Sequence, residues 1–160
     1  MEPVTAARVT RSYTQHLDFP PERVFPLLCP VREREWVDGW ECRVVYSKSG
    51  VAEEGCVFTT SRPGEADTVW TITHRDERAF HVEFVMVTPD SRVGELRIDV
   101  RPDGNARSLC DVAYTFTALT PHGERYVEEF TDEAYRDRMR HWEAAVNHYL
   151  STGTVLRTEH

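Results

Sequence analysis

The sequence predicts an α+β protein in which a curved, seven-stranded antiparallel sheet wraps round one long C-terminal helix. Two patterns support this fold class. Residues 41–119 contain short segments with alternating apolar and polar side chains, separated by turn residues, which is typical of an antiparallel meander. In residues 132–150, apolar and aromatic side chains recur at three- and four-residue steps, which indicates an amphipathic helix. The apolar stripe of this helix is expected to pack on the sheet.

The segment before the meander predicts one more strand and two short helices. Residues 8–19 carry apolar side chains largely at alternate positions and form the expected first strand. Pro20 and Pro21 end this strand and open a short helix, which Pro30 stops. A second short helix is expected through residues 32–36.

The meander divides into six predicted strands, separated by turns rich in glycine, proline and aspartate. Their expected ranges are 41–47, 55–61, 67–76, 79–88, 92–102 and 107–119. The long helix is expected to begin after Thr131, an N-cap residue followed by acidic residues, and to end near Leu150, before Gly153. Residues 121–130 allow two interpretations, an extension of this helix or a separate turn before it.

Length and composition predict a single water-soluble domain over residues 1–160, with an ordered core from about residue 7 to residue 152. Apolar residues make up 40% of the chain and charged residues 29%, which excludes the disordered and collagen-like classes. No apolar run approaches the ~20 residues that a membrane helix needs, and residues 1–4 lack the layout of a secretion signal. We therefore expect a cytoplasmic protein without stable membrane insertion.

Charge and cysteine usage narrow the expected partners. The formal net charge is −8, from 27 acidic and 19 basic residues, so the average field repels phosphate backbones and no nucleic-acid partner is expected. Cys29, Cys42, Cys56 and Cys110 form no Cys-x-x-Cys pair and match no zinc-site spacing, which predicts free thiols, no metal and no cofactor. The sequence leaves the oligomeric state open between monomer and homodimer.

Alternate residues of a strand point to opposite faces of the sheet. In each strand, the alternate set with more apolar side chains is therefore predicted to line the concave face. A sheet of this length presents more apolar area than one helical stripe covers, so either large side chains fill the gap or a cavity remains. Apolar cavities with a few polar groups are typical small-molecule sites. The predicted ligand-binding residues, from these strands and from the long helix, are Tyr46, Phe58, Trp70, Ile72, His74, Phe84, Ile98, Val112, Tyr114, Met139, Trp142 and Val146.

Two of the candidates for chemistry each have a structural alternative. Cys29, with Glu33 and Trp36 one and two turns further on, could lie at the pocket mouth as a nucleophile or ligand, although a small core thiol is the commoner role of cysteine. His74 could contact a ligand carbonyl or act as an acid or base, or it could be a hydrogen-bonded histidine at the rim.

Other polar patterns predict structure rather than chemistry. The charged run at residues 32–35 is interpreted as a solvated helix face. His16 and His81 occupy the alternate strand positions that are expected to point outwards, away from the interior. His141 and His148 lie seven residues apart on one helix face, which is not the closer spacing that favours metal binding. No metal site or catalytic motif is therefore predicted.

The order strand, two short helices, six-stranded meander and long helix resembles the SRPBCC superfamily, which includes START lipid-transfer domains, birch-pollen-allergen-like proteins and polyketide cyclases. The resemblance covers residues 7–152. Residues 20–25, Pro-Pro-Glu-Arg-Val-Phe, are similar to the family's opening of the first helix, and residues 28–36, 39–42 and 54–58 resemble a bacterial subgroup. The resemblance implies a helix-grip fold but says little about chemistry, because this superfamily hosts carriers, receptors and enzymes on one scaffold.

Three functions therefore compete. The leading hypothesis is a binding or carrier protein for a small hydrophobic, lipid-like or aromatic ligand held between sheet and helix. The alternatives are a polyketide cyclase-like or hydrolase-like enzyme acting on such a molecule, and a chaperone-activator-like interaction module. A carrier needs a roomy apolar cavity, an enzyme needs polar groups that converge on one point, and an interaction module needs a filled core with an exposed apolar patch.

Overall fold

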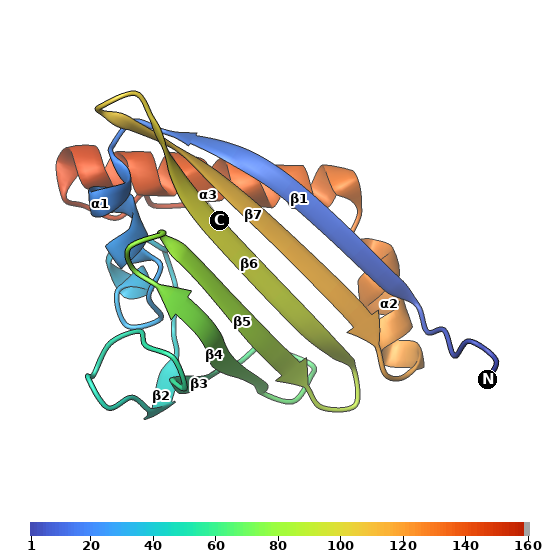
Figure 1. Ribbon diagram of the computed structural model, residues 1–160. Coiled ribbons are helices and arrows are strands. Elements are labelled where there is room, and N and C mark those ends of the chain that lie inside the picture. The colour runs from blue at the N-terminus through green and yellow to red at the C-terminus, as the bar shows by residue number, and fades with distance from the viewer. Residues whose placement is uncertain (159–160) are drawn as a thin grey trace.

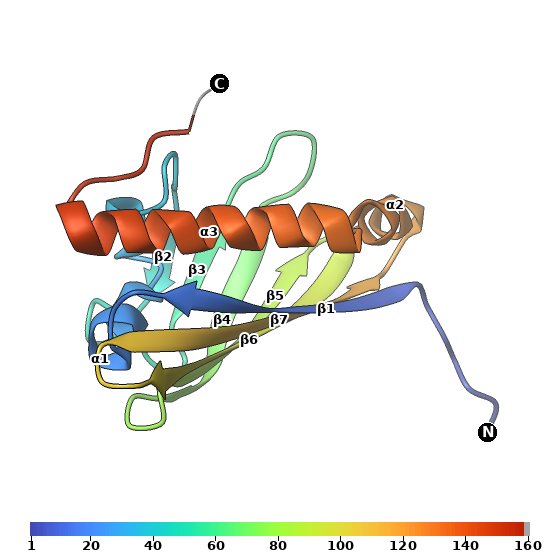
Figure 2. The same cartoon turned by 90° about the horizontal axis from the view of Figure 1, so that it is seen from above.

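The chain folds into one seven-stranded antiparallel sheet with a long helix lying across its concave face (Figures 1 and 2). The computed structural model describes residues 1–158. In chain order the elements are β1 (Arg8–Leu17), α1 (Pro21–Val24), η1 (Phe25–Leu27), η2 (Glu33–Glu35), β2 (Arg43–Tyr46), β3 (Val57–Thr60), β4 (Thr68–Asp76), β5 (His81–Thr88), β6 (Arg92–Asp103), β7 (Arg107–Ala118), α2 (Pro121–Glu129) and α3 (Asp132–Thr152).

The sheet has the strand order β1-β7-β6-β5-β4-β3-β2, and every neighbouring pair is antiparallel. The six strands after residue 40 thus form the predicted meander, and β1 joins it beside the last strand, where Tyr13 pairs with Val112. The predicted fold class is confirmed: a seven-stranded antiparallel sheet, short helices after the first strand and a long C-terminal helix. The strands β2 and β3 are shorter than expected, with four residues each.

The question left open at residues 121–130 is answered by a second helix, α2. Thr120 begins it: its hydroxyl accepts a hydrogen bond from the Gly123 amide, and Pro121 occupies the first turn. The chain leaves the helix at Phe130 and begins α3 at Thr131, whose hydroxyl accepts from the Ala134 amide at 3.2 Å. Two separate N-caps therefore produce two helices where one continuous helix was also conceivable.

Polar contacts fix α3 along the β1 side of the sheet. The amide of His16 donates to the Glu143 carboxylate at 2.7 Å, and the amide of Asp18 donates to the Asn147 side chain at 2.8 Å. Both amides belong to the outer edge of the sheet or to the residue that follows it. Beneath them, the buried side chain of Gln15 donates to the Met139 carbonyl at 3.1 Å. Because α3 is held at this edge, it covers the β1 and β7 side most closely.

The buried face of α3 confirms the predicted helical phase. Tyr135, Met139 and Val146 are each at most 1% exposed. The Tyr135 hydroxyl donates to the Val112 carbonyl at 2.6 Å, which joins the first turn of the helix to β7. Within residues 1–158, no helix is both long and apolar enough to cross a membrane.

Aromatic rings close the sheet against the junction of α2 and α3. Phe130 lies in this junction, with its ring centroid 4.9 Å from that of Phe116 on β7 and 5.5 Å from that of Tyr135. Tyr126 on α2 packs edge-on against Phe116 at 5.1 Å. Such offset and edge-on contacts are the favoured geometries of aromatic pairs. The position of α2 therefore determines how one end of the interior is closed.

We predict that Gly123→Ala lowers the free energy of unfolding by about 1–3 kcal/mol, because an added Cβ would overlap the backbone carbonyl of Ser91 between β5 and β6. Neither backbone segment can yield without moving α2 or the turn. The matched control is Glu128→Ala at an exposed position of the same helix, which should stay within about 0.5 kcal/mol. Urea melts that give equal losses for both variants would contradict the close contact.

Candidate functional site

A cavity of about 400 Å³ lies between the concave face of the sheet and α3. Its walls come from strands β3 to β7, from the segment that follows α1, and from α2 and α3. Most of its lining is aromatic or aliphatic, including Phe58, Trp70, Phe84, Ile98, Phe116 and Trp142. This is the part of the concave face that α3, held along the β1 edge, does not fill.

Six of the twelve predicted ligand-binding residues line this cavity: Phe58, Trp70, Phe84, Ile98, Tyr114 and Trp142. Four others, Ile72, Val112, Met139 and Val146, are buried members of the packed core and do not line it. Other side chains of the core pack around them and leave no open space. The remaining two, Tyr46 and His74, are exposed.

The inward orientation expected for Tyr46 and His74 is wrong, and β-bulges are the reason. The pairing register shifts between Val44 and Tyr46 and again between Ile72 and His74. An extra residue in one strand turns the following side chains to the opposite face. His74 consequently lies on the outer face, where its Nδ1 is 3.0 Å from the Glu54 carboxylate. Tyr46 is 58% exposed on the edge strand β2.

Stacked aromatic rings form the walls of the cavity. Phe58 and Trp70 stack with centroids 5.4 Å apart, and Phe84 meets both of them edge-on. On the opposite side, Trp142 of α3 stacks on Trp36 at 5.7 Å. Rings that pack against each other in this way keep their orientation, so the cavity has preformed walls.

Several polar side chains of the lining satisfy one another. The Trp70 indole nitrogen donates to the Thr60 hydroxyl at 2.9 Å, and the hydroxyls of Thr68 and Thr88 are 2.7 Å apart. These four groups can therefore face an apolar ligand without losing a hydrogen bond to water.

A buried ion pair lines one end of the cavity. Arg92 donates two hydrogen bonds to Glu65, at 2.8 and 3.1 Å, and both side chains are less than 10% exposed. The guanidinium also lies over the Tyr126 ring, 3.4 Å from its centroid. The hydrogen bond from Arg92 lowers the pKa of Glu65, so this carboxylate is ionised and neutralised by its partner. The pair holds the loop between β3 and β4 to the start of β6.

Other polar groups of the lining have no protein partner, and the buried indole nitrogen of Trp142 is one of them. Among residues 1–158, neither the Glu33 carboxyl nor the Tyr114 hydroxyl makes a hydrogen bond. Burial raises the pKa of Glu33 to about 8, so at neutral pH this side chain is a carboxylic acid that can donate as well as accept a hydrogen bond. Both groups are available to a ligand inside the cavity.

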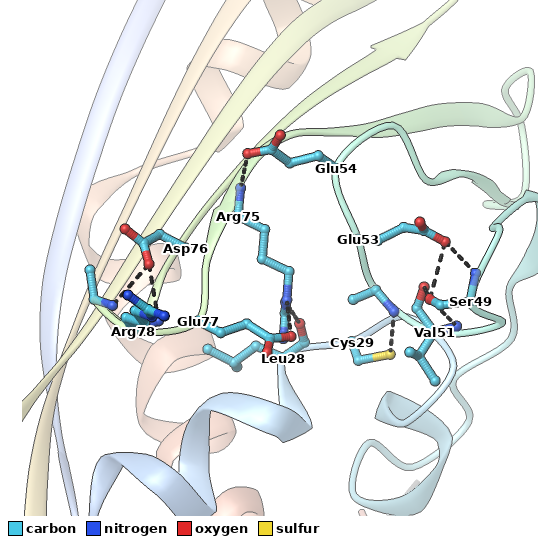
Figure 3. Close-up of polar contacts among 12 residues, drawn as sticks. Leu28, Cys29, Ser49, Val51, Glu53, Glu54, Arg75, Asp76, Glu77 and Arg78 are labelled. Carbon is cyan, nitrogen blue, oxygen red and sulfur yellow. Dashed lines mark hydrogen bonds and ion pairs between the residues drawn. The ribbon is translucent and has the colours of Figure 1, made fainter.

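The segment that carries Glu33 is fixed by contacts with the sheet. Arg75 on β4 donates to the Leu28 carbonyl at 3.2 Å and lies 4.4 Å from the centroid of the Phe25 ring. The Cys29 sulfur accepts from the Ala52 amide at 3.3 Å (Figure 3). Cys29 is buried among these contacts and is absent from the cavity lining, which supports the structural alternative for this thiol.

The histidine pair of α3 is split between two environments. His141 lines the cavity, whereas His148 contacts the Thr154 hydroxyl at 3.2 Å. In the part of the chain that the structure describes, no three histidine, cysteine or acidic side chains form a group that could hold a metal ion.

Sequence reasoning missed the charged residues of the lining. It interpreted residues 32–35 as a solvated run and named Glu33 only beside Cys29 at a possible pocket mouth. It did not select Arg62, Arg92 or Arg138, because the strand alternation and the helical stripe both select apolar positions. One signal was available on α3. Arg138 and Ala145 lie four residues before and three residues after Trp142 on the same helix face, so placing Trp142 at the cavity also places them there.

Neither a protein-family model nor a curated protein sequence matches this chain. Solved structures match it in shape. Norcoclaurine synthase from Thalictrum flavum, in complex with dopamine and hydroxybenzaldehyde, has a TM-score of 0.68 at 11% identity, covering 97% of this chain and 91% of that one. Ara h 8.0201 has a TM-score of 0.64 at 15% identity, with coverages of 91% and 99%. CalU16 from Micromonospora echinospora has a TM-score of 0.60 at 14% identity, with coverages of 89% and 78%.

These likenesses show that the chain has a helix-grip fold, as its sequence predicts. At 11 to 15% identity they show the fold and not the chemistry. The chemistry of this chain therefore depends on the residues of its own cavity.

We predict that Glu33 makes the protein less stable as the pH rises from about 5 to about 8. In this window the folded chain keeps the Glu33 proton that the unfolded chain has released, so the free energy of unfolding falls by up to about 1.4 kcal/mol per pH unit. Glu33→Gln removes this contribution. Urea melts from pH 5 to pH 9 should show the variant gaining stability relative to the native protein as the pH rises from about 5 to about 8.

The control for this experiment is Glu41→Gln, an exposed carboxylate a few residues further along the chain. Its stability should follow that of the native protein at every pH. If Glu33→Gln also runs parallel to the native protein, Glu33 is ionised in the folded state and the proposed burial of its carboxyl is wrong.

Proposed function

We propose that this protein binds one small hydrophobic molecule, aromatic or lipid-like, in the cavity between the sheet and α3. The observation that carries the proposal is the cavity itself: its volume of about 400 Å³ is within the range of about 300–1,000 Å³ typical of small-molecule sites, and its walls are mainly aromatic and aliphatic. A filled interior would have argued for a protein-interaction module instead.

The size of the cavity limits the ligand and its affinity. A ligand of about 20 non-hydrogen atoms, each contributing about 0.3 kcal/mol, would bind with about 6 kcal/mol, which is a dissociation constant in the tens of micromolar. Aromatic ligands suit the site because the stacked pairs Phe58–Trp70 and Trp36–Trp142 present ring faces and edges. The norcoclaurine synthase of the same fold, which holds dopamine and hydroxybenzaldehyde, supports a small aromatic occupant.

A second candidate is an enzyme that acts on the same kind of molecule. The unpartnered Glu33 carboxyl and Tyr114 hydroxyl favour it, because a neutral carboxylic acid facing an apolar cavity can transfer a proton to a bound molecule. Native mass spectrometry separates the two candidates. A carrier releases the ligand that it bound, whereas an enzyme converts it to a product of different mass or structure.

We predict that N-phenyl-1-naphthylamine, a neutral fluorescent probe, binds the native protein saturably with a stoichiometry of one. Ala145→Phe should weaken this binding at least about tenfold, because Ala145 is a buried residue of α3 that lines the cavity and a phenyl ring there occupies the ligand's space. Since the ring enters a hollow, the variant should lose no more than about 1–3 kcal/mol of stability. Fluorescence titration and urea melts measure the two effects.

The adjacent Ala144→Phe provides the matched control, because Ala144 is exposed and does not line the cavity. It should bind the probe like the native protein. If the native protein shows no saturable binding, or if both variants bind equally well, the cavity is not a ligand site and the carrier hypothesis fails.

A further inference from the structure

The cavity mouth carries positive charge that the protein does not neutralise. Arg62, in the loop after β3, and Arg138, on α3, both line the cavity and are exposed to solvent. Within the described residues 1–158, neither guanidinium lies within 4 Å of a carboxylate. His141 lines the cavity one helical turn after Arg138.

The other arginines of α3 show that this arrangement is specific to the cavity face. Arg136 pairs with Asp132 at 2.9 Å, and Arg140 lies 3.6 Å from Asp137. Both are exposed, and neither lines the cavity. The residues three and four positions from Arg138 are Ala134, Tyr135, His141 and Trp142, none of which is acidic. On this helix, the one arginine that faces the cavity is the one without an acidic partner.

The acidic residues of the lining do not cancel this charge. Glu65 is bound to Arg92 in the buried pair, so together the two contribute no net charge. Burial raises the pKa of Glu33 to about 8, which leaves its carboxyl neutral at pH 7. A side pocket of about 160 Å³ is lined by Arg62, Arg125, Glu129 and the Arg92-bound Glu65, so its two arginines outnumber the one carboxylate that Arg92 does not bind. In a chain of net charge −8, the cavity is thus a locally cationic site.

Both arginines are near enough to the interior to meet a bound ligand. The guanidinium carbon of Arg62 lies 5.5 Å from the centroid of the Tyr126 ring, which is itself part of the lining. Burial raises the pKa of Tyr114, and the charge of Arg138 opposes that shift, so the field of Arg138 reaches a hydroxyl inside the cavity. The apolar walls and the cationic mouth therefore belong to one site.

We propose that the natural ligand is an amphipathic acid, whose apolar part fills the cavity while Arg62 and Arg138 hold its carboxylate, sulfonate or phosphate group at the mouth. This inference rests on the proposed ligand-binding function. Guanidinium groups bind oxyanions through paired, charge-assisted hydrogen bonds, and a charge at the mouth keeps part of its hydration. The aromatic interior could not hold the same anion, because an unpaired buried charge is strongly unfavourable.

The test compares two probes with the same skeleton. N-phenyl-1-naphthylamine is neutral, and 8-anilino-1-naphthalenesulfonate differs from it by one sulfonate. Fluorescence titration of the native protein at pH 7 should give one site for each probe, with the sulfonate binding at least about tenfold more tightly. In the double variant Arg62→Gln/Arg138→Gln this preference should disappear, while the neutral probe binds within about twofold of its native affinity.

Arg140→Gln is the control, because it removes one arginine from the same helix outside the cavity. It should keep the preference for the sulfonate. If the neutral probe binds nowhere, the proposed ligand-binding function fails and this inference fails with it. Three other outcomes would overturn this inference alone and leave the cavity as a ligand site. The sulfonate could bind the native protein no more tightly than the neutral probe. Its tighter binding could also persist in the double variant, or be lost in Arg140→Gln.

Discussion

The structure depends on a mismatch of area: one helix must cover the concave face of seven strands. The mismatch is resolved at the β1 edge, where Glu143 and Asn147 of α3 accept hydrogen bonds from the amides of His16 and Asp18. Edge amides need partners, and side chains of a helix supply them here. Held at this edge, α3 packs Met139 and Val146 into the core and leaves the middle strands to face open space. The cavity is the consequence of where the helix is anchored.

The same constraint explains how the polar groups are distributed. A cavity wall must satisfy its own hydrogen bonds where an apolar ligand will lie against it. Thr68 and Thr88 do so by pairing with each other, and Arg92 does so with Glu65 across the loop that closes one end. Against this background, the groups left without partners are exceptions: Glu33, Tyr114 and the indole nitrogen of Trp142 inside the cavity, and Arg62 and Arg138 at its mouth.

Periodicity was sufficient to predict the fold, because alternation defines strands and three- to four-residue spacing defines the helix. It predicted the cavity walls where a strand is regular, as at Phe58, Phe84 and Tyr114. It failed at His74, because a bulge after Ile72 reverses the alternation and no residue type announces that bulge. Alternation also could not distinguish Val112, which is packed in the core, from Ile98, which lines the cavity. Both point to the concave face, and the path of α3 over the sheet decides which of them is covered.

The interior acid and the mouth cations are compatible because burial changes the state of the acid. An ionised Glu33 would offset one of the two arginines and repel an anionic ligand. As a neutral acid, which the raised pKa favours at pH 7, it leaves the cationic mouth intact and offers the ligand a hydrogen-bond donor at depth. The two features are therefore complementary: in the proposed site Arg62 and Arg138 hold the charged end of a ligand, and Glu33 and Tyr114 are left to recognise a neutral polar atom on the part that is buried.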